Sequence, residues 1–218
     1  SELAVMVYLL AAFGLHADGH HEGAMLECFI PYFGGFGLNF TLDGFRLIYA
    51  TIVAFMWAGA TLLSGEYFKH HHFTDRFYLF LLWTMGATMA VFLSADLATT
   101  FIFFEVMSFT SYVWVAQEEN APSLKAAGTY LAVAVIGGLV MLMGLFLLYF
   151  QAGTLEINRL YEACQGKNVY VAAGCLFFGF GAKAGAFPLH IWLPKAHPVA
   201  PAPASALLSG ILTKSGIF

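Results

Sequence analysis

Apolar residues along this chain gather in long runs that are separated by short polar stretches. A helix needs about 20 consecutive, mostly apolar residues to cross the hydrocarbon core of a bilayer. The alternation that membrane strands require is absent from these runs. The pattern therefore predicts an all-α, polytopic transmembrane helix bundle. It predicts about seven spans or partial spans, at residues 3–15, 42–65, 77–94, 97–116, 126–150, 179–194 and 202–218.

Both ends of the sequence fall within apolar runs, so we expect a longer protein, with the first run as the tail of a helix that begins upstream. The fifth run is rich in glycine, and small residues let membrane helices approach closely. Basic residues in the connections show a small excess on one side, which the positive-inside rule assigns to the cytoplasm. That side carries Lys69, Arg76, Lys125 and Lys195, and the other carries Arg46, Arg159 and Lys167.

Composition excludes several classes of protein. Of the 218 residues 60% are hydrophobic and only 10% are charged, whereas soluble domains carry about 25% charged residues. The net charge of −4 leaves no basic patch for a nucleic acid. The three cysteines, Cys28, Cys164 and Cys175, have no C-x-x-C spacing. They predict neither a disulfide framework nor an iron–sulfur site, and we expect no cofactor.

Three ionisable residues lie near the middle of predicted spans: Glu105, Lys183 and Lys214. Such a residue costs about 2.5–3.5 kcal/mol at a helix centre, and it is by default a candidate functional group. On a helix, Ser108 and Tyr112 share the face of Glu105, so its carboxylate should point into the bundle. Lys214 lies about half a span from the preceding turn, and the alternative for it is an amine that reaches the interface near a helix end.

The stretch GFGAKAGAFPLHIWLP places Lys183 shortly before Pro188. Proline removes a backbone hydrogen bond and crowds the preceding turn, so it predicts an interrupted helix. Interrupted membrane helices line a cavity or are covered by protein. The alternative is a proline-kinked packing helix. His190 follows the break, and it fits a proton relay and a hydrogen-bonded interface residue equally well.

Opposite charges within several ångströms of each other stabilise each other's ionised forms. Glu105 and Lys183, if so placed, titrate as a coupled pair. We interpret such a pair as a unit of proton transfer, because moving a neighbouring charge changes which partner holds the proton. The alternative is a static buried ion pair that fixes helix packing, although such pairs stabilise little compared with apolar residues.

Other candidate sites are weaker. Adjacent histidines at His70, His71 and His72, and the group of His16, His20, His21 and Glu22, lie in polar loops, and solvated loops explain them better than a metal site. GFGAKAG lacks the G-x-G-x-x-G spacing of a dinucleotide loop. No arrangement of residues indicates a covalent active site.

The stretch GAKAGAFPLHIWLPKAHPVAPAPASALLSGILTKSGIF, together with FIFFEVMSFTSY, resembles one family of membrane proteins. These are the antiporter-like proton-translocating subunits of respiratory complex I and of energy-converting hydrogenases, and the large subunits of multisubunit Na⁺/H⁺ antiporters. The resemblance implies two inverted five-helix repeats with ion sites near the midplane. It implies that Glu105 is the family's membrane glutamate, Lys183 its partner on the broken helix, and Lys214 the lysine that passes protons onward.

The resemblance covers residues 41–218 and divides the chain into three parts. These are a partial helix and extramembrane loop at 1–41, a flanking helix and loop at 42–76, and a first repeat at 77–218, truncated in its last helix. Lys195 stands where the family often has an acidic residue, and residues 200–203 read APAP in place of a Gly-Pro-Thr-Pro-like turn. The sequence around His190 is closer to that of the hydrogenase-type members.

These features together predict a non-catalytic subunit of a redox-driven oxidoreductase complex, of the NADH–quinone or hydrogenase type. It would move H⁺ through a buried Glu-Lys-Lys relay in a bacterial or archaeal cytoplasmic membrane. One alternative is a Na⁺/H⁺ antiporter subunit that uses the same residues without redox chemistry. Another is a structural scaffold whose buried charges lock the helices. The expected partners are other membrane subunits, the lipid bilayer and H⁺ or Na⁺, with no nucleic acid.

Overall fold

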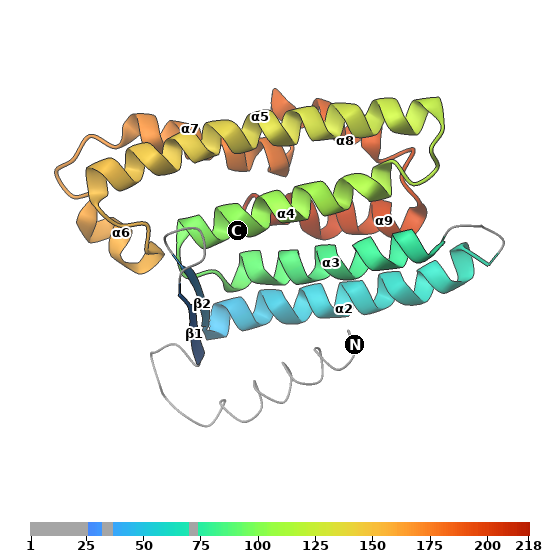
Figure 1. Cartoon of the computed structure of the whole chain (residues 1–218), viewed down its shortest axis with the longest axis horizontal. Coiled ribbons are helices and arrows are strands. Elements are labelled where there is room, and N and C mark those ends of the chain that lie inside the picture. Colours follow the sequence, from blue (N-terminus) through green and yellow to red (C-terminus); the bar gives the residue numbers. More distant parts are fainter. Residues whose placement is uncertain (1–25, 32–36, 70–73) are drawn as a thin grey trace.

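The computed structural model of the chain describes residues 26–31, 37–69 and 74–218 (Figure 1). Within these ranges five helical stretches are long and apolar enough to cross a membrane: α2 (Gly44–Tyr67), α3 (Thr74–Leu93), α4 (Leu97–Val115), α5 (Ala121–Ala152), and the stretch Tyr170–Ala196, which contains α7 (Tyr170–Ala184). The predicted helical membrane bundle is confirmed. The predicted run at 3–15 and all the histidines of the two loop groups lie outside the described residues.

Helix boundaries follow from local capping. Asp96 precedes α4, and its carboxylate accepts a hydrogen bond from the Thr99 N–H at 2.7 Å, which satisfies one of the free donors of the first turn. α5 begins earlier than the predicted position 126, because Asn120 caps it through the Ser123 N–H at 2.8 Å. Pro122 then lies in the first turn, where a missing N–H costs nothing.

Successive long helices run in opposite directions along the bundle (Figure 1). α2, α3 and α4 pack side by side, and α5 and α7 form a closely packed pair that meets α4. Glycines bring α5 and α7 together, as predicted: a Cβ built at Gly144 would lie 2.8 Å from the Cβ of Cys175, and one at Gly179 would lie 2.8 Å from the Gly137 carbonyl oxygen. The separation of these two helices is therefore set by the absence of side chains.

One element was not predicted. β1 (Leu26–Ile30) pairs antiparallel with β2 (Leu38–Leu42) in a two-stranded sheet, mostly within the part at 1–41 where the sequence predicts an extramembrane loop. Long-range contacts satisfy β2: Asn39 N donates to Thr99 Oγ1 at 3.0 Å, and Ala95 N donates to the Asn39 carbonyl at 2.9 Å. The prediction of a helical bundle is confirmed, and this hairpin adds two short strands to it. The two strands pair locally in sequence, while residues 95 and 99, far along the chain, hold the second strand.

The predicted interruption is present, but the helix ends before the proline. α7 ends at Ala184, and Gly185 follows with φ +72°, a left-handed conformation that glycine adopts without steric cost. Beyond Pro188 come the short 3₁₀ helix η1 (Leu189–Trp192) and α8 (Leu193–Ala196). A short helix, α6 (Ile157–Ala163), precedes α7.

The last predicted run, at 202–218, is helical but irregular. It contains α9 (Ala202–Leu207), a π-helical stretch η2 (Leu208–Leu212) and α10 (Thr213–Ser215). α9 packs against α2, and α10 packs against α7. The total of seven spans and the division into three parts stay predictions.

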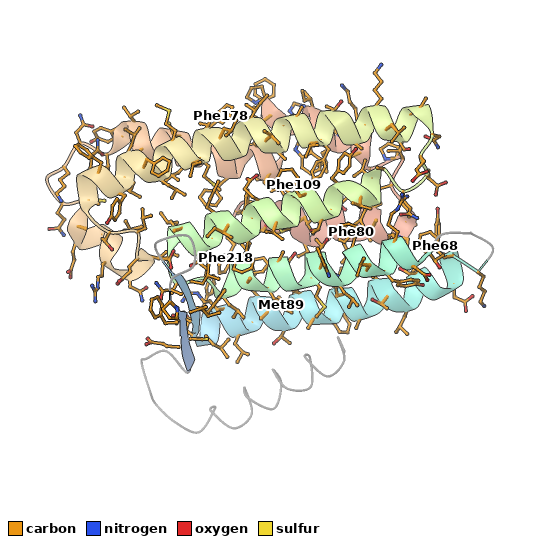
Figure 2. The ribbon with its side chains drawn as sticks, viewed as in Figure 1. Phe68, Phe80, Met89, Phe109, Phe178 and Phe218 are labelled. Carbon is orange, nitrogen blue, oxygen red and sulfur yellow. The ribbon has the colours of Figure 1, made fainter. Side chains whose placement is uncertain are left out.

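Apolar side chains cover the outside of the bundle as well as its core (Figure 2). Phe109, which Figure 2 labels, and Leu139 are more than half exposed, and Phe150 is 89% exposed. The buried core is apolar too, with Trp57, Trp114 and Phe77 fully enclosed. A bundle that is apolar both inside and outside is that of an integral membrane protein.

Candidate functional site

Lys183 is a buried lysine at the carboxyl end of α7. Its residue is 3% exposed, and its Nζ donates hydrogen bonds to the Tyr130 hydroxyl at 2.6 Å and to Ser108 Oγ at 2.9 Å. The amine also lies 4.9 Å from the ring centroid of Tyr130 and 6.0 Å from that of Phe104. Two hydroxyls and two aromatic rings from α4 and α5 thus solvate the charge in place of water.

A chain of buried hydroxyls continues from the amine. The hydroxyls of Tyr130 and Ser111 are 2.6 Å apart, and Ser111 Oγ donates to the Met107 carbonyl at 2.6 Å. Ser108 Oγ donates to the Phe104 carbonyl at 2.9 Å. A protonated lysine only donates hydrogen bonds. Each of the two hydroxyls therefore accepts a hydrogen bond from Lys183 and donates one to an acceptor on α4.

Glu105 lies half-buried on α4, and its carboxylate faces Gly138 of α5. A Cβ built at Gly138 would lie 2.7 Å from Glu105 Cδ and 2.9 Å from its Oε2, so an alanine there would require the carboxylate to move. Glu105 and Lys183 act on each other electrostatically. The ion pairs within the described ranges are Arg46–Asp43, Lys69–Glu66, Arg76–Glu119 and Arg159–Glu156, and none joins these two residues.

The other two residues of the predicted relay lie on the surface of this chain. Lys214 is exposed, and its Nζ donates to the Ser209 carbonyl at 2.7 Å. Its helix α10 is nevertheless close to the end of α7, because a Cβ at Gly216 would lie 2.8 Å from the Ala184 nitrogen. His190 is exposed on η1, and its ring stacks on Phe187 with the centroids 5.7 Å apart. No described contact joins either residue to Lys183.

Sequence reasoning missed Tyr130, Ser111 and Trp192. Tyr130 lies near the start of the run at 126–150 among small and apolar residues, and a phenol in that setting is the signal that could have marked it. Trp192 is buried after the helix break, where its indole N–H donates to the Ala182 carbonyl at 2.8 Å and its ring packs on Tyr130 with centroids 4.9 Å apart. Trp192 thus satisfies a carbonyl that the end of α7 leaves free.

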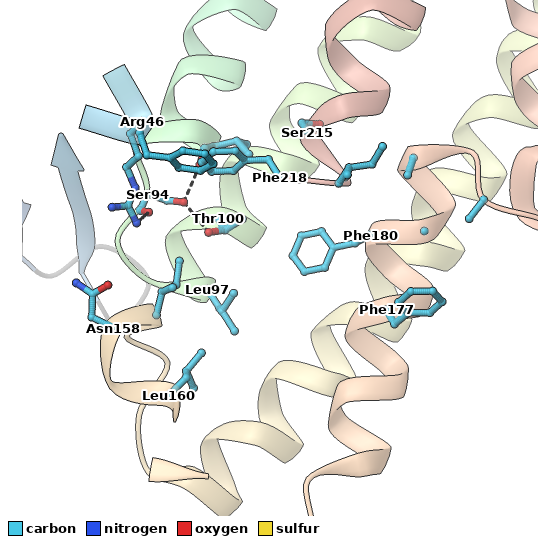
Figure 3. Close-up of a pocket in the computed structure, with 18 of the residues that line it drawn as sticks. Arg46, Ser94, Leu97, Thr100, Asn158, Leu160, Phe177, Phe180, Ser215 and Phe218 are labelled. Carbon is cyan, nitrogen blue, oxygen red and sulfur yellow. Dashed lines mark hydrogen bonds between the residues drawn. The ribbon is translucent and has the colours of Figure 1, made fainter. Parts of the chain in front are cut away.

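A cavity of about 890 Å³ lies between the ends of α2, α3 and α4, the short helix α6, and the region where α7 meets α10; its lining includes Gly181 and Ala184, which flank Lys183 in sequence. Figure 3 shows Arg46 and Ser94 on one wall and Phe180 on the other. Arg46 is only 8% exposed; it pairs with Asp43, and its Nη2 donates to the Ser94 carbonyl at 3.2 Å. Ser94 and Thr100 hydroxyls are 2.6 Å apart on the same wall. No cluster of potential metal ligands occurs in the part of the chain that the structure describes.

Comparison with known proteins identifies similar chains. The family model described as "NADH:quinone oxidoreductase/Mrp antiporter, TM" matches residues 94–218. The chain is 32% identical over 202 residues to hydrogenase-4 component B of Escherichia coli, covering 91% of this chain and 30% of that protein. It is 34% identical over 208 residues to a Na(+)/H(+) antiporter subunit of Alkalihalophilus pseudofirmus, covering 90% of this chain and 25% of that one.

Two solved structures share the fold. One is the membrane-bound sulfane sulfur reductase, described as an archaeal respiratory membrane complex, with a TM-score of 0.80 and 24% identity over 99% of this chain and 34% of that one. The other is the Mrp complex from Dietzia, with a TM-score of 0.83 and 22% identity over 99% of this chain and 40% of that one. The chain therefore spans well under half the length of these relatives.

Proposed function

Because the chain belongs to the NADH:quinone oxidoreductase/Mrp antiporter transmembrane family, we propose that it moves protons across a membrane within a redox-driven complex, as one of its non-catalytic subunits. The complex would be of the NADH–quinone or hydrogenase type and would lie in a bacterial or archaeal cytoplasmic membrane. Its partners would be other membrane subunits, as expected for a relative of a hydrogenase component. The redox chemistry belongs to those partners, and this chain supplies the proton path.

The observation that carries the proposal is the arrangement around Lys183. A buried amine at a helix break is held by two hydroxyls, while the carboxylate of Glu105 faces Gly138 instead of the amine. A static ion pair would join the two charges directly. Here each charged group is held by different neighbours, and a small movement of α4 or α7 changes the electrostatic interaction between the two charges. Such an arrangement suits a switch better than a fixed structural contact.

We propose the following order of events. Movement of Glu105 relative to Lys183 changes how strongly the amine holds its proton, and the proton then passes through water and His190 to Lys214. His190 and Lys214 are both exposed on this chain, so these later steps need water. The contact of α10 with the end of α7 supports a path in this direction, because it keeps the backbone just after Lys214 close to the helix break.

Sodium–proton antiport is the second candidate, and the 34% identity to the Na(+)/H(+) antiporter relative favours it. The same residues would then serve an exchange of H⁺ for Na⁺ without any redox partner. Replacing Na⁺ by choline distinguishes the two functions. Proton movement in a redox-driven complex continues without Na⁺, whereas proton movement in an antiporter requires it.

The test uses the full-length protein in its intact complex, reconstituted into vesicles that contain a pH-sensitive dye. We expect Glu105→Gln and Lys183→Ala each to abolish most of the proton movement while the complex still assembles. Lys125→Ala is the matched control, because it removes an exposed lysine near the start of α5. If both buried-charge variants assemble and move protons at the wild-type rate, the residues are a scaffold and the proposal is wrong.

A further inference from the structure

Helix α5 contacts both charges of the site. Tyr130 accepts a hydrogen bond from Lys183 at 2.6 Å, and Gly138, two turns further along, receives the carboxylate of Glu105. The helix itself carries only one charged residue, Lys125, close to its start. α5 is also the helix that packs most closely on α7, which carries the lysine, and it packs on α4, which carries the glutamate.

The Tyr130 hydroxyl is fixed on both sides. It is fully buried, it lies 2.6 Å from Ser111 Oγ on α4, and its ring packs on Trp192 beyond the helix break. The phenol therefore cannot follow the amine if the amine moves. Because Lys183 donates to this hydroxyl and to Ser108, two hydrogen bonds hold the amine beside the hydroxyls.

Gly138 acts on the other partner. Its bare Cα leaves the space that the Glu105 carboxylate occupies, and a methyl group there would overlap both oxygens. The carboxylate of Glu105 thus has a position against α5 that does not depend on the amine of Lys183. The two positions together explain how opposite charges in one apolar bundle remain without a direct ion pair.

We propose that α5 sets the separation of Glu105 and Lys183, with Tyr130 as the positioning residue for the amine and Gly138 as the seat of the carboxylate. This inference rests on the proposed function only in the experiment that measures transport. Tyr130 does not exchange a proton with the path in this proposal. It holds Lys183 where a modest shift of Glu105 changes the interaction between them.

The first measurement is structural and needs no transport. We expect cryo-electron microscopy of the intact complex with Tyr130→Phe to show the Lys183 amine moved to ion-pair distance from Glu105, about 4 Å or less. Phenylalanine keeps the ring that packs on Trp192, so a role in packing alone would leave the amine in place. An amine that stays beside Ser108 at its wild-type distance from Glu105 would overturn the proposal.

The second measurement is the rate of proton movement at a saturating level of the driving reaction. We expect Tyr130→Phe to lower it at least about tenfold, because the hydrogen bond that is lost involves a charged group. Gly138→Ala should lower it too, through displacement of the carboxylate with the Tyr130 hydroxyl intact. Tyr49→Phe is the matched control, since Tyr49 stacks on Phe92 away from the site. Wild-type rates in both site variants would contradict the inference.

Two further results distinguish a failure of this proposal from a failure of the proposed function. If Tyr130→Phe fails to assemble, Ser111→Ala removes the fixed partner of the phenol, and we expect the Lys183 amine to approach Glu105 in that variant. An unmoved amine in Ser111→Ala counts against the proposal. If the amine moves in Tyr130→Phe but Lys183→Ala transports normally, the spacing role of α5 stands and the proposed function fails.

Discussion

The contact between α5 and α7 offers a quantitative test of what sets the distance between these two helices. A Cβ at Gly144 would lie 2.8 Å from the Cβ of Cys175 and 3.1 Å from the Ala172 carbonyl oxygen and the Leu176 nitrogen. Carbon atoms in good contact are about 3.5–4.0 Å apart, so Gly144→Ala must push the helices apart. Overpacking of this kind costs about 1–3 kcal/mol.

The same substitution also has a favourable component, because alanine stabilises a helix interior by about 1 kcal/mol relative to glycine. Gly144→Ala should therefore change the free energy of unfolding by about zero to 2 kcal/mol in the destabilising direction. Gly128 is the matched control on the same helix, since a Cβ there meets nothing within 4 Å. Gly128→Ala should stabilise the protein, and the two variants should differ by about 1–3 kcal/mol.

The assay is equilibrium unfolding of the full-length protein in mixed detergent micelles, followed by the loss of helical circular dichroism. A double-mutant cycle with Cys175→Gly removes the opposing Cβ, and we expect it to recover part of the loss. Recovery is incomplete because the backbone contacts at Ala172 and Leu176 remain. Equal shifts for Gly144→Ala and Gly128→Ala would refute the reasoning that bare glycine surfaces set the distance between α5 and α7.

Two other predictions concern the ends of helices. Trp192→Phe keeps an aromatic ring beside Tyr130 but leaves the Ala182 carbonyl without its hydrogen-bond donor. It should destabilise the fold by about 1–3 kcal/mol in the same unfolding assay. An unchanged unfolding midpoint would mean that another group donates to this carbonyl. Asp96→Ala removes the N-cap of α4 and should lower the free energy of unfolding by about 0.5–2 kcal/mol. Asp96→Asn should retain most of the stability, because its amide oxygen still accepts a hydrogen bond from the Thr99 N–H. Similar losses in both variants would assign the effect to charge instead of capping.

The helices of the bundle are predictable from the sequence because each is a local property. A run of apolar residues long enough to cross a bilayer has few alternatives to a helix, since every backbone group needs a partner in lipid. The predicted run at 97–116 accordingly matches α4 closely. Errors arise where a cap or a distant partner decides. Asn120 extends α5, Gly185 ends α7 before Pro188, and contacts with residues 95 and 99 hold the unpredicted strand β2.

The site divides in the same way. The sequence alone determined that Glu105 and Lys183 are costly in their spans and that Lys183 lies beside a helix break, because hydrophobic runs and proline act locally. Only the tertiary structure decided which groups solvate the amine. Tyr130 and Ser108 come from two other helices, and Gly138 gives the carboxylate a separate seat, so the separation of the charges depends on how closely α5 packs on α4 and α7. Packing distances of this kind are set jointly by residues far apart in sequence, which no local pattern records.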